Sequence, residues 1–456
     1  MKLIYGIKDK PKFGQVIVFA IQQLLAIMAA TLVVPVIINT SGSMPEGAPL
    51  MSSAAALFGA GVGTLIYQLF TRFRSPVFLG SSFAFIGSMC AAFAGAVSAQ
   101  AGYLGLLIGA VSAGLVYVLI AIVVKLVGVK WITTLMPAVV IGPTVAIIGL
   151  SLAGNAIGDL QTAPAGGSTY VAIICGLVTL AVTMLCATFG KKMIRLIPFI
   201  MGILAGYAVA AIFTVIGNVA GIDALKVINF DPLINLFADF GVQSFVAIPD
   251  FTFVEAIKGI KDVDSDFILT VLVAYIPVAA VVFAEHIADH KNLSSIIEKD
   301  LLEDPGLHNT LLGDGVGSMG GAFFGGCPNT TYGESVGCVA ITGNASVITI
   351  TTTAILAMVI SFLSPFVAFV NTIPSCVMGG VCMALYGFIA VSGLKMIQKV
   401  DLEQNRNLFV VSAILISGIG GLTVSFGKVS LTSVACALIL GILTNLMLNS
   451  KKNKQD

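Results

Sequence analysis

Charged residues are scarce in this sequence. Only 10% of the 456 residues are charged, whereas 57% are hydrophobic and the mean hydropathy is +1.04. A soluble domain has about 25% charged residues. With a formal net charge of +1, the chain also lacks the excess of Lys and Arg that binding to nucleic acid requires. The composition therefore predicts an all-α polytopic membrane protein with no nucleic-acid partner.

Potential metal ligands are also few. There are three His, and the eight Cys lack the close paired spacing of a zinc site. His286 and His290 share a helical face, but a metal site usually needs a third or fourth ligand. We therefore expect no metal and no cofactor, and we interpret the cysteines as small packing residues.

Long apolar runs recur along the whole chain. A run of roughly 18 residues is long enough to cross a bilayer. Reading these runs against polar breaks predicts fourteen spans: 17–38, 52–70, 77–97, 103–124, 132–154, 168–188, 196–217, 267–289, 309–325, 330–348, 349–371, 373–394, 407–423 and 430–449.

The basic residues support this count. An even number of spans puts both termini on one side, and the basic residues then gather on that side, which the positive-inside rule makes cytoplasmic. The exceptions are Lys226, Lys258, Lys261 and Lys428. We therefore expect a multi-pass protein with both termini in the cytoplasm.

Weak internal similarity divides the chain into two halves of seven spans. MPAVVIG (136–142) matches IPSCVMG (373–379), and Pro35 in span 1 corresponds to Pro277 in span 8. The offsets between these pairs are similar, as one duplication would produce. Because seven is odd, the second half must enter the membrane from the opposite side. Such inverted repeats are typical of secondary transporters.

Spans 3 and 10 are rich in residues that interrupt helices. They contain RSPVFLGSSFAFIGS (74–88) and FFGGCPNTTYGESVG (323–337). We expect each to be a broken helix, with a short extended piece followed by a half-helix whose free N–H groups face a small polar ligand. The alternative is a reentrant loop that serves only for packing.

Three acids occur where charge is costly. Glu285 and Asp289 follow an uncharged run and, at i and i+4, share one helical face. Glu334 lies in the second broken segment. An acid at mid-membrane costs roughly 2.5–3.5 kcal/mol, so such residues mark functional sites. Desolvation disfavours the charged form, so each could take up a proton on one side and release it on the other.

The sequence allows more than one interpretation of several polar residues. The first two acids could be solvated at a helix end beside Lys291, unless the helix continues through NLSSII (292–297). Asp314 could cap a helix or support the site. Gln23, with its neighbour Gln22, lies in span 1, where an amide needs a hydrogen-bond partner.

The sequence resembles the nucleobase–ascorbate transporter family, and within it the bacterial uracil permeases. The resemblance runs from QQLLAIMAATLVVPVI (22–37) to the last spans. It includes GSSFAFI (80–86), AEHIADH (284–290), DPGLHNTLLGDG (304–315) and PNTTYGESVGCVAITG (328–343). The last segment contains the family signature, from Glu334 through Gly337 to Thr342.

The resemblance implies roles for particular residues. Glu285 and Glu334 match the acids that bind the nucleobase, and Glu334 matches one that is protonated during binding. Phe83 and Gly333 match residues whose backbone N–H groups meet the carbonyl oxygens of the base, and Tyr332 lines the same pocket. Asp289 matches a position linked to proton movement.

The resemblance also implies an architecture. Residues 1–130 and 267–371 (spans 1–4 and 8–11) would form a core domain. Residues 131–266 and 372–456 (spans 5–7 and 12–14) would form a gate domain. The core would move like an elevator against the gate, in a homodimer in the bacterial inner membrane, surrounded by lipid.

The function implied is proton-coupled import of uracil, without enzymatic activity. Two alternatives remain: a xanthine or other purine permease of the same family, or an anion exchanger of the same fold. Ser335 replaces the usual Asn of the signature, and Gln23 replaces a His that many relatives carry. Any proton role of that His therefore does not transfer.

Overall fold

The computed structural model describes residues 3–128, 137–164, 166–191, 193–426 and 429–449. It is predominantly helical, as predicted. The helices are α1 Phe13–Thr40, α2 Ser53–Phe70, α3 Ile86–Ala94, α4 Ala99–Val127, α6 Ala138–Ser151, α7 Ala153–Gln161, α8 Thr169–Phe189, α9 Met193–Leu196, α10 Pro198–Ala220, α11 Asp231–Ala238, α12 Thr252–Lys258, α13 Ser265–Ile297, α14 Leu307–Gly325, α15 Gly333–Thr342, α16 Val347–Ile360, α17 Ser364–Asn371, α18 Ser375–Ile397, α19 Asn405–Ile419 and α20 Ser433–Asn449. The described strands are β1 Leu79–Ser81, β2 Asn329–Thr331, β3 Val424–Phe426 and β4 Val429–Leu431.

Many helices are long enough to cross a membrane. Among the described residues, eight combine sufficient length with sufficient hydropathy: Phe13–Thr40, Ser53–Phe70, Ala99–Val127, Ala138–Gln161, Thr169–Phe189, Pro198–Ala220, Ser265–Ile297 and Ser375–Ile397. The other predicted spans correspond to shorter helices or, at 309–325, to the glycine-rich α14. The total of fourteen spans and their inverted repeat stay predictions. The start of the predicted span 132–154, the domain boundary at 130/131 and Lys428 lie outside the described residues.

The two glycine-rich segments meet at a small antiparallel ladder. β1 pairs with β2, with Leu79 opposite Thr331 and Ser81 opposite Asn329. Helix α2 holds both strands: the Thr64 hydroxyl accepts from the Leu79 N–H at 2.9 Å, and Asn329 Nδ2 donates to the Gly59 carbonyl at 3.1 Å. The predicted extended pieces at 74–88 and 323–337 thus contain strands, each followed by a helical segment that starts at Phe83 or Gly333.

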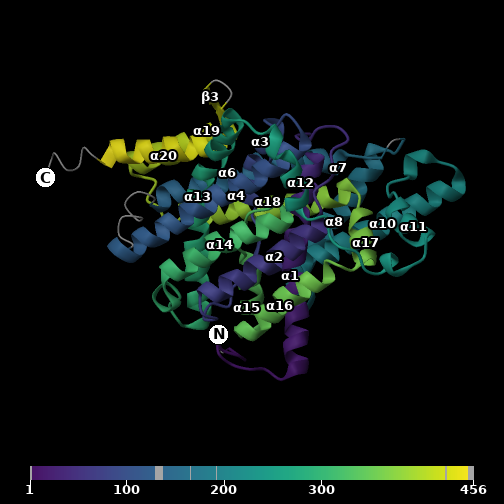
Figure 1. Ribbon diagram of the computed structural model, residues 1–456, viewed down its shortest axis with the longest axis horizontal. Helices are drawn as coiled ribbons and strands as arrows, with labels where there is room; N and C mark the ends of the chain where they lie inside the picture. Colours follow the sequence, from purple (N-terminus) through teal and green to yellow (C-terminus); the bar gives the residue numbers. More distant parts are fainter. Residues whose placement is uncertain (1–2, 129–136, 165, 192, 427–428, 450–456) are drawn as a thin grey trace.

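The helices pack in two groups. In the first, α2 packs on α14, α4 packs on α13 and α14, and α16 packs on α1 and α2. In the second, α6, α7 and α8 pack on α18, α10 packs on α8, and α19 packs on α20 and α6. Figure 1 shows α19 and α20 at one edge of the molecule and α1, α2, α15 and α16 toward the end where the N-terminus lies.

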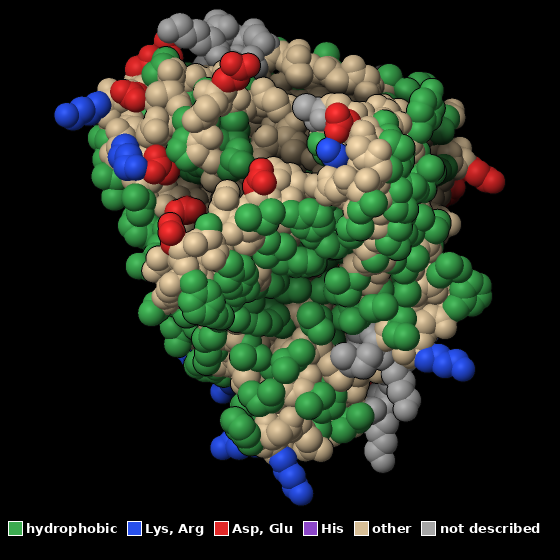
Figure 2. Space-filling model, turned by 90° about the vertical axis from the view of Figure 1, so that its right-hand side faces the viewer, with side chains coloured by type: hydrophobic (Ala, Val, Ile, Leu, Met, Phe, Trp, Pro, Cys, Tyr) green, Lys and Arg blue, Asp and Glu red, His purple; other side chains and the backbone are tan. Residues whose placement is uncertain are grey.

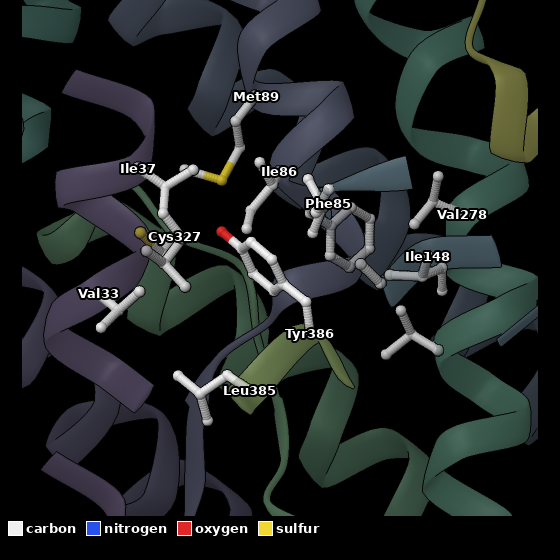
Figure 3. Packing of buried hydrophobic residues seen from close by; sticks show 14 of the residues in the cluster. Val33, Ile37, Phe85, Ile86, Met89, Ile148, Val278, Cys327, Leu385 and Tyr386 are labelled. Atoms are coloured by element: carbon white, nitrogen blue, oxygen red, sulfur yellow. The ribbon is translucent and has the colours of Figure 1, made fainter. Parts of the chain in front are cut away.

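Tyr386 of α18 lies at the contact between the groups. Figure 3 shows its ring among Ile37 of α1, Ile86 of α3 and Cys327, with Ile148 and Val278 farther to one side. All of these side chains are buried. Close packing here fixes the position of the second group relative to β1 and to the helical turn η1, Phe83–Phe85, that follows β1.

The outer surface suits lipid. Figure 2 shows a belt of hydrophobic side chains across one face, with Asp and Glu gathered above it. Among the exposed side chains of α8 and α10 are Ile174, Leu185, Ile212 and Ile216. An apolar belt of this kind matches the hydrocarbon layer of a bilayer.

Asp304, between α13 and α14, forms two exposed ion pairs. It lies 2.7 Å from Lys299 Nζ and 2.9 Å from the Arg74 guanidinium. Its hydrogen bonds to Lys299 and then Arg74 hold the pKa of Asp304 below its ordinary value. The stabilisation is therefore present above the ordinary pKa and is lost as the pH falls through the folded-state pKa.

We expect Asp304→Asn to lower the thermal stability at pH 7 slightly, by less than about 1 kcal/mol, because exposed pairs are screened by solvent. The difference from wild type should shrink in acid and in 1 M salt. Thermal unfolding of the detergent-solubilised protein at several pH values measures this. Glu303→Gln, at an exposed neighbouring acid, is the control. A difference that persists in acid would contradict the assignment.

Candidate functional site

A cavity of about 360 Å³ lies where the two helix groups meet. Its volume is within the range of pockets that hold small ligands. Its lining combines polar and apolar residues: Ser81, Ser82, Phe83, Ala84, Val145, Ile148, Phe199, Glu285, Ala288, Asp289, Thr330, Thr331, Tyr332, Gly333, Glu334, Leu385, Phe388, Ile389, Ser392 and Met396. We call this the acid cavity. It brings together Phe83, Glu285, Asp289, Tyr332, Gly333 and Glu334, all of them predicted site residues.

Helix α13 supplies two of the acids. Asp264 caps its start by accepting from the Phe267 N–H at 2.7 Å, and the helix continues to Ile297. Glu285 and Asp289 face the acid cavity and are half-buried. The alternative of two solvated acids at a helix end is therefore wrong, because α13 continues for eight residues beyond Asp289.

Asp289 is held by the second strand. The Thr331 hydroxyl donates to the Asp289 carboxylate at 2.8 Å. Because Thr331 belongs to β2, this hydrogen bond joins α13 to the ladder and positions the Asp289 carboxylate at the cavity wall. Sequence reasoning did not predict this partner.

Two helix starts supply N–H groups to the cavity. Phe83 is the first residue of η1, and Gly333 is the first residue of α15. The first N–H groups of a helix have no partner within it and carry partial positive charge. The two starts follow opposite ends of the antiparallel ladder, which is about 7 Å long at about 3.4 Å per residue step. They can therefore approach one small ligand from two directions.

Tyr332 ties the ladder to α1. Its hydroxyl donates to the Ser81 carbonyl at 2.9 Å, and the Thr31 hydroxyl lies 3.4 Å away. Gly80 makes this possible, because a Cβ there would lie 2.4 Å from the Tyr332 ring. The buried Tyr332 side chain therefore fixes the helix start that carries Gly333 and Glu334.

Gln23 lies behind the acid cavity and is absent from its lining. Its Nε2 donates to the Ser335 hydroxyl at 2.5 Å, and the Phe78 N–H donates to the same oxygen at 3.3 Å. Gln23 is thus partnered, as a buried amide should be. Ser335 joins α1, α15 and the residue before β1.

We expect Ser335→Ala to lower the free energy of unfolding by about 1–3 kcal/mol, because two buried donors lose their acceptor. Thermal unfolding of the purified protein followed by size-exclusion chromatography measures this. Thr352→Ala, which removes an exposed hydroxyl from α16, is the control. Equal stability of the two variants would show that the Gln23–Ser335 contact contributes little.

Asp314 also lies outside the acid cavity. It is in the middle of α14, so the helix-cap alternative is wrong. Its carboxylate lies 2.7 Å from His286 Nδ1, and His286 Nε2 lies 3.0 Å from the Thr310 hydroxyl. His290 Nε2 lies 2.7 Å from the Tyr67 hydroxyl. These buried contacts fasten a neighbouring face of α13, about 100° around the helix from its acids, to α14 and α2.

Sequence reasoning missed the apolar wall of the cavity. Val145 and Ile148 come from α6, Phe199 from α10, and Leu385 and Phe388 from α18. This wall can pack against the faces of a flat ring while the acids and helix starts bind its edge. Within the described ranges, no group of three or more His, Cys, Asp and Glu residues could hold a metal ion.

The sequence and the structure both have known relatives. The profile of the permease family matches residues 14–426. A uracil permease of Bacillus subtilis (strain 168) is 36% identical over 463 residues, covering 100% of this chain and 97% of that protein. A uracil permease of Escherichia coli (strain K12) is 34% identical over 446 residues, covering 97% and 93%.

A solved structure shares the fold. The transmembrane domain of a cyanobacterial bicarbonate transporter, BicA, superimposes with a TM-score of 0.56 at 14% identity, covering 96% of this chain and 99% of that domain. At this identity the likeness concerns the fold alone. The sequence relatives, in contrast, confirm the family resemblance drawn from the signature segments.

Proposed function

This chain belongs to the permease family, and from that premise we propose that it imports uracil across the bacterial inner membrane together with protons. Its relatives are named as permeases, so it is an integral membrane transporter and not an enzyme. The observation that carries the proposal is the acid cavity, where carboxylates and two helix starts line one small chamber.

The cavity chemistry complements a pyrimidine. Uracil has two N–H donors and two carbonyl acceptors. The Glu285 carboxylate accepts from one N–H group, and the Glu334 carboxyl, which keeps an acceptor oxygen when it is protonated, accepts from the other. The backbone N–H groups of Phe83 and Gly333 donate to the carbonyl oxygens. Tyr332 positions the helix start of α15. A site that pairs each edge group discriminates against analogues that leave one unpaired.

The acids also suit proton coupling. Glu334 and Asp289 line the cavity near each other in the fold, since the Thr331 hydroxyl that binds Asp289 lies three residues before Glu334. Neutralising one acid reduces repulsion with the others and helps an uncharged base to bind. Proton uptake at Glu334 and Asp289 thereby favours substrate binding. Gln23 and Asp314 support the site through Ser335 and His286.

The proposed transport cycle uses two domains. The first helix group corresponds to the core and the second to the gate, within fourteen spans arranged as inverted repeats with broken helices at spans 3 and 10. The acid cavity has residues of both groups in its wall, and movement of the core past the gate would carry the base across. Both termini are cytoplasmic in this arrangement, and the protein works as a homodimer surrounded by lipid.

The cavity argues against anion exchange. None of the described residues in its lining is Lys or Arg, whereas three acids are present. A purine permease remains as the alternative, because xanthine offers a similar edge of N–H and carbonyl groups.

Uptake by proteoliposomes tests the proposal. Wild-type protein should accumulate radiolabelled uracil when an inward proton gradient is imposed, and a protonophore should abolish the accumulation. Xanthine accumulation without uracil accumulation would move the assignment to the purine carriers. If neither base accumulates, the proposed function is wrong.

A further inference from the structure

A second cavity of about 300 Å³ lies beside the acid cavity. It is bounded by the chain just after α1, by α3, by the α6–α7 junction, by Val278 of α13 and by the start of α20. We call it the vestibule. Its volume is close to that of the acid cavity and at the lower end of the range for small-ligand pockets.

The two cavities share a wall. Phe83, Ala84 and Ile148 are in the lining of both. Phe83 and Ala84 come from the first helix group, and Ile148 comes from α6 in the second. The partition is therefore formed between the two groups, and relative movement of the groups would change it.

The cavities lie one after the other along the same helices. On α13, Val278 lines the vestibule, whereas Asp289 lines the acid cavity. These positions are about 16 Å apart along the helix at about 1.5 Å per residue. On α6 the order is reversed: Val145 lines the acid cavity, and Ser151 lines the vestibule. The vestibule and the acid cavity thus follow one another along these helices and are separated by the wall that they share.

The lining of the vestibule, as far as the structure describes it, mixes polar and apolar residues and carries no charge. None of its described lining residues is Asp, Glu, Lys, Arg or His. Several carry hydroxyl groups, among them Ser41, Ser43 and Ser151, and Asn155 contributes a carboxamide that can both donate and accept. This chemistry suits a small neutral molecule with mixed donors and acceptors, and it offers nothing to stabilise an ion.

From this geometry we propose that the vestibule is a second, weaker binding site for the same uncharged nucleobase, which it holds before the base passes the Phe83–Ala84–Ile148 wall. This inference rests on the proposed function, because the acid cavity must be the main site. Binding is weaker since the vestibule lacks the carboxylates that form the strongest hydrogen bonds.

Cys90 provides a native reporter inside the vestibule. Among the eight cysteines, Cys90 and Cys186 are partly exposed and the other six are buried. In a Cys186→Ser background, a hydrophilic maleimide should therefore modify mainly Cys90 in the detergent-solubilised protein. Cys90→Ser in the same background shows how much of the signal comes from that thiol.

The decisive measurement adds Glu285→Gln to this background, which weakens uracil binding in the acid cavity by about 100-fold. Uracil should still slow modification of Cys90, by a factor of one plus the ratio of its concentration to the Kd of the vestibule. If uracil protects Cys90 only when Glu285 is present, the effect comes from the acid cavity and the proposal is wrong. Uptake by the wild type reports separately on the proposed function.

Gly87 allows the vestibule to be filled. It is part of the lining, and a Cβ there would have no neighbour within 4 Å, so the first atom of a larger side chain enters open space. Gly87→Leu should remove the protection of Cys90 and raise the KM for uracil several-fold while uracil binding to the acid cavity persists. Gly14→Leu, on an equally open position of α1, is the matched control. Unchanged KM and unchanged protection in Gly87→Leu would overturn the proposal.

Discussion

Replacing Glu285 by Gln is expected to lower gradient-driven uracil uptake by about 100-fold. The carboxylate can accept from the uracil N–H groups, whereas the amide presents an NH₂ donor to them on one side. A hydrogen bond to a charged group contributes about 1.5–3 kcal/mol, and each 1.4 kcal/mol corresponds to a tenfold change in binding. The loss should appear in kcat/KM for radiolabelled uracil in proteoliposomes.

The same experiment includes two comparisons. Glu334→Gln should have a loss of similar size, because Glu334 lines the same cavity. Glu303→Gln makes the same chemical change at an exposed position between α13 and α14 and should transport like the wild type. If both cavity variants transported normally, the acid cavity would not be the uracil site.

The acids of the site could be predicted because charged residues are unusual beside or within long apolar segments. A carboxylate next to an apolar run stands out by its cost, and the spacing of Glu285 and Asp289 assigns both to one face of a helix. The helix that carries them extends to Ile297, as the apolar and polar pattern of 292–297 allowed. The prediction of Phe83 and Gly333 as site residues depended on the family resemblance, because every residue except Pro has a backbone N–H and the sequence does not show which of them bind a ligand.

The apolar wall of the cavity could not be predicted from composition. Val145, Phe199 and Leu385 are no different in kind from residues of α8 or α10 that face outward, and in lipid both environments favour the same side chains. Only the packing of α6 against α18 decides which apolar residues face a ligand. One indication in the sequence that α6 and α18 are related is the proline, Pro137 or Pro374, that immediately precedes each helix.

Pairing over a long sequence distance was also hidden. Strands of three residues are too short for a pattern, so the pairing of Gly80 with Thr330 left no periodic signal. The same holds for His286 and Asp314, 28 residues apart. His286 and His290 are both fully buried, although Lys291 follows them in the sequence. From sequence alone, a histidine next to a lysine is predicted to be solvent-exposed, because its buried hydrogen-bond partner cannot be identified.

Replacing Gly321 by Ala is expected to destabilise the protein by about 3 kcal/mol, at the upper end of the range for overpacking. A Cβ on Gly321 would lie 2.1 Å from Asn329 Nδ2. Across the same contact, a Cβ on Gly59 would lie 2.3 Å from the Gly321 carbonyl oxygen. Small residues of this kind let membrane helices approach closely. Separating α2 from α14 would break the hydrogen bond from Asn329 to Gly59 that holds β2.

Gly321→Ala should therefore weaken uracil binding as well as lower the stability of the protein. Because β2 leads directly into the helix start at Gly333, a displaced Asn329 shifts the N–H groups and Glu334 that line the acid cavity. Gly320→Ala is a close control: its new Cβ would be too close only to the tip of the Ile66 side chain, which can rotate away. Thermal stability by size exclusion, together with KM for uracil, should separate the two variants. If Gly321→Ala matched Gly320→Ala in both measurements, the tight crossing of α2 and α14 would not be what positions the ladder.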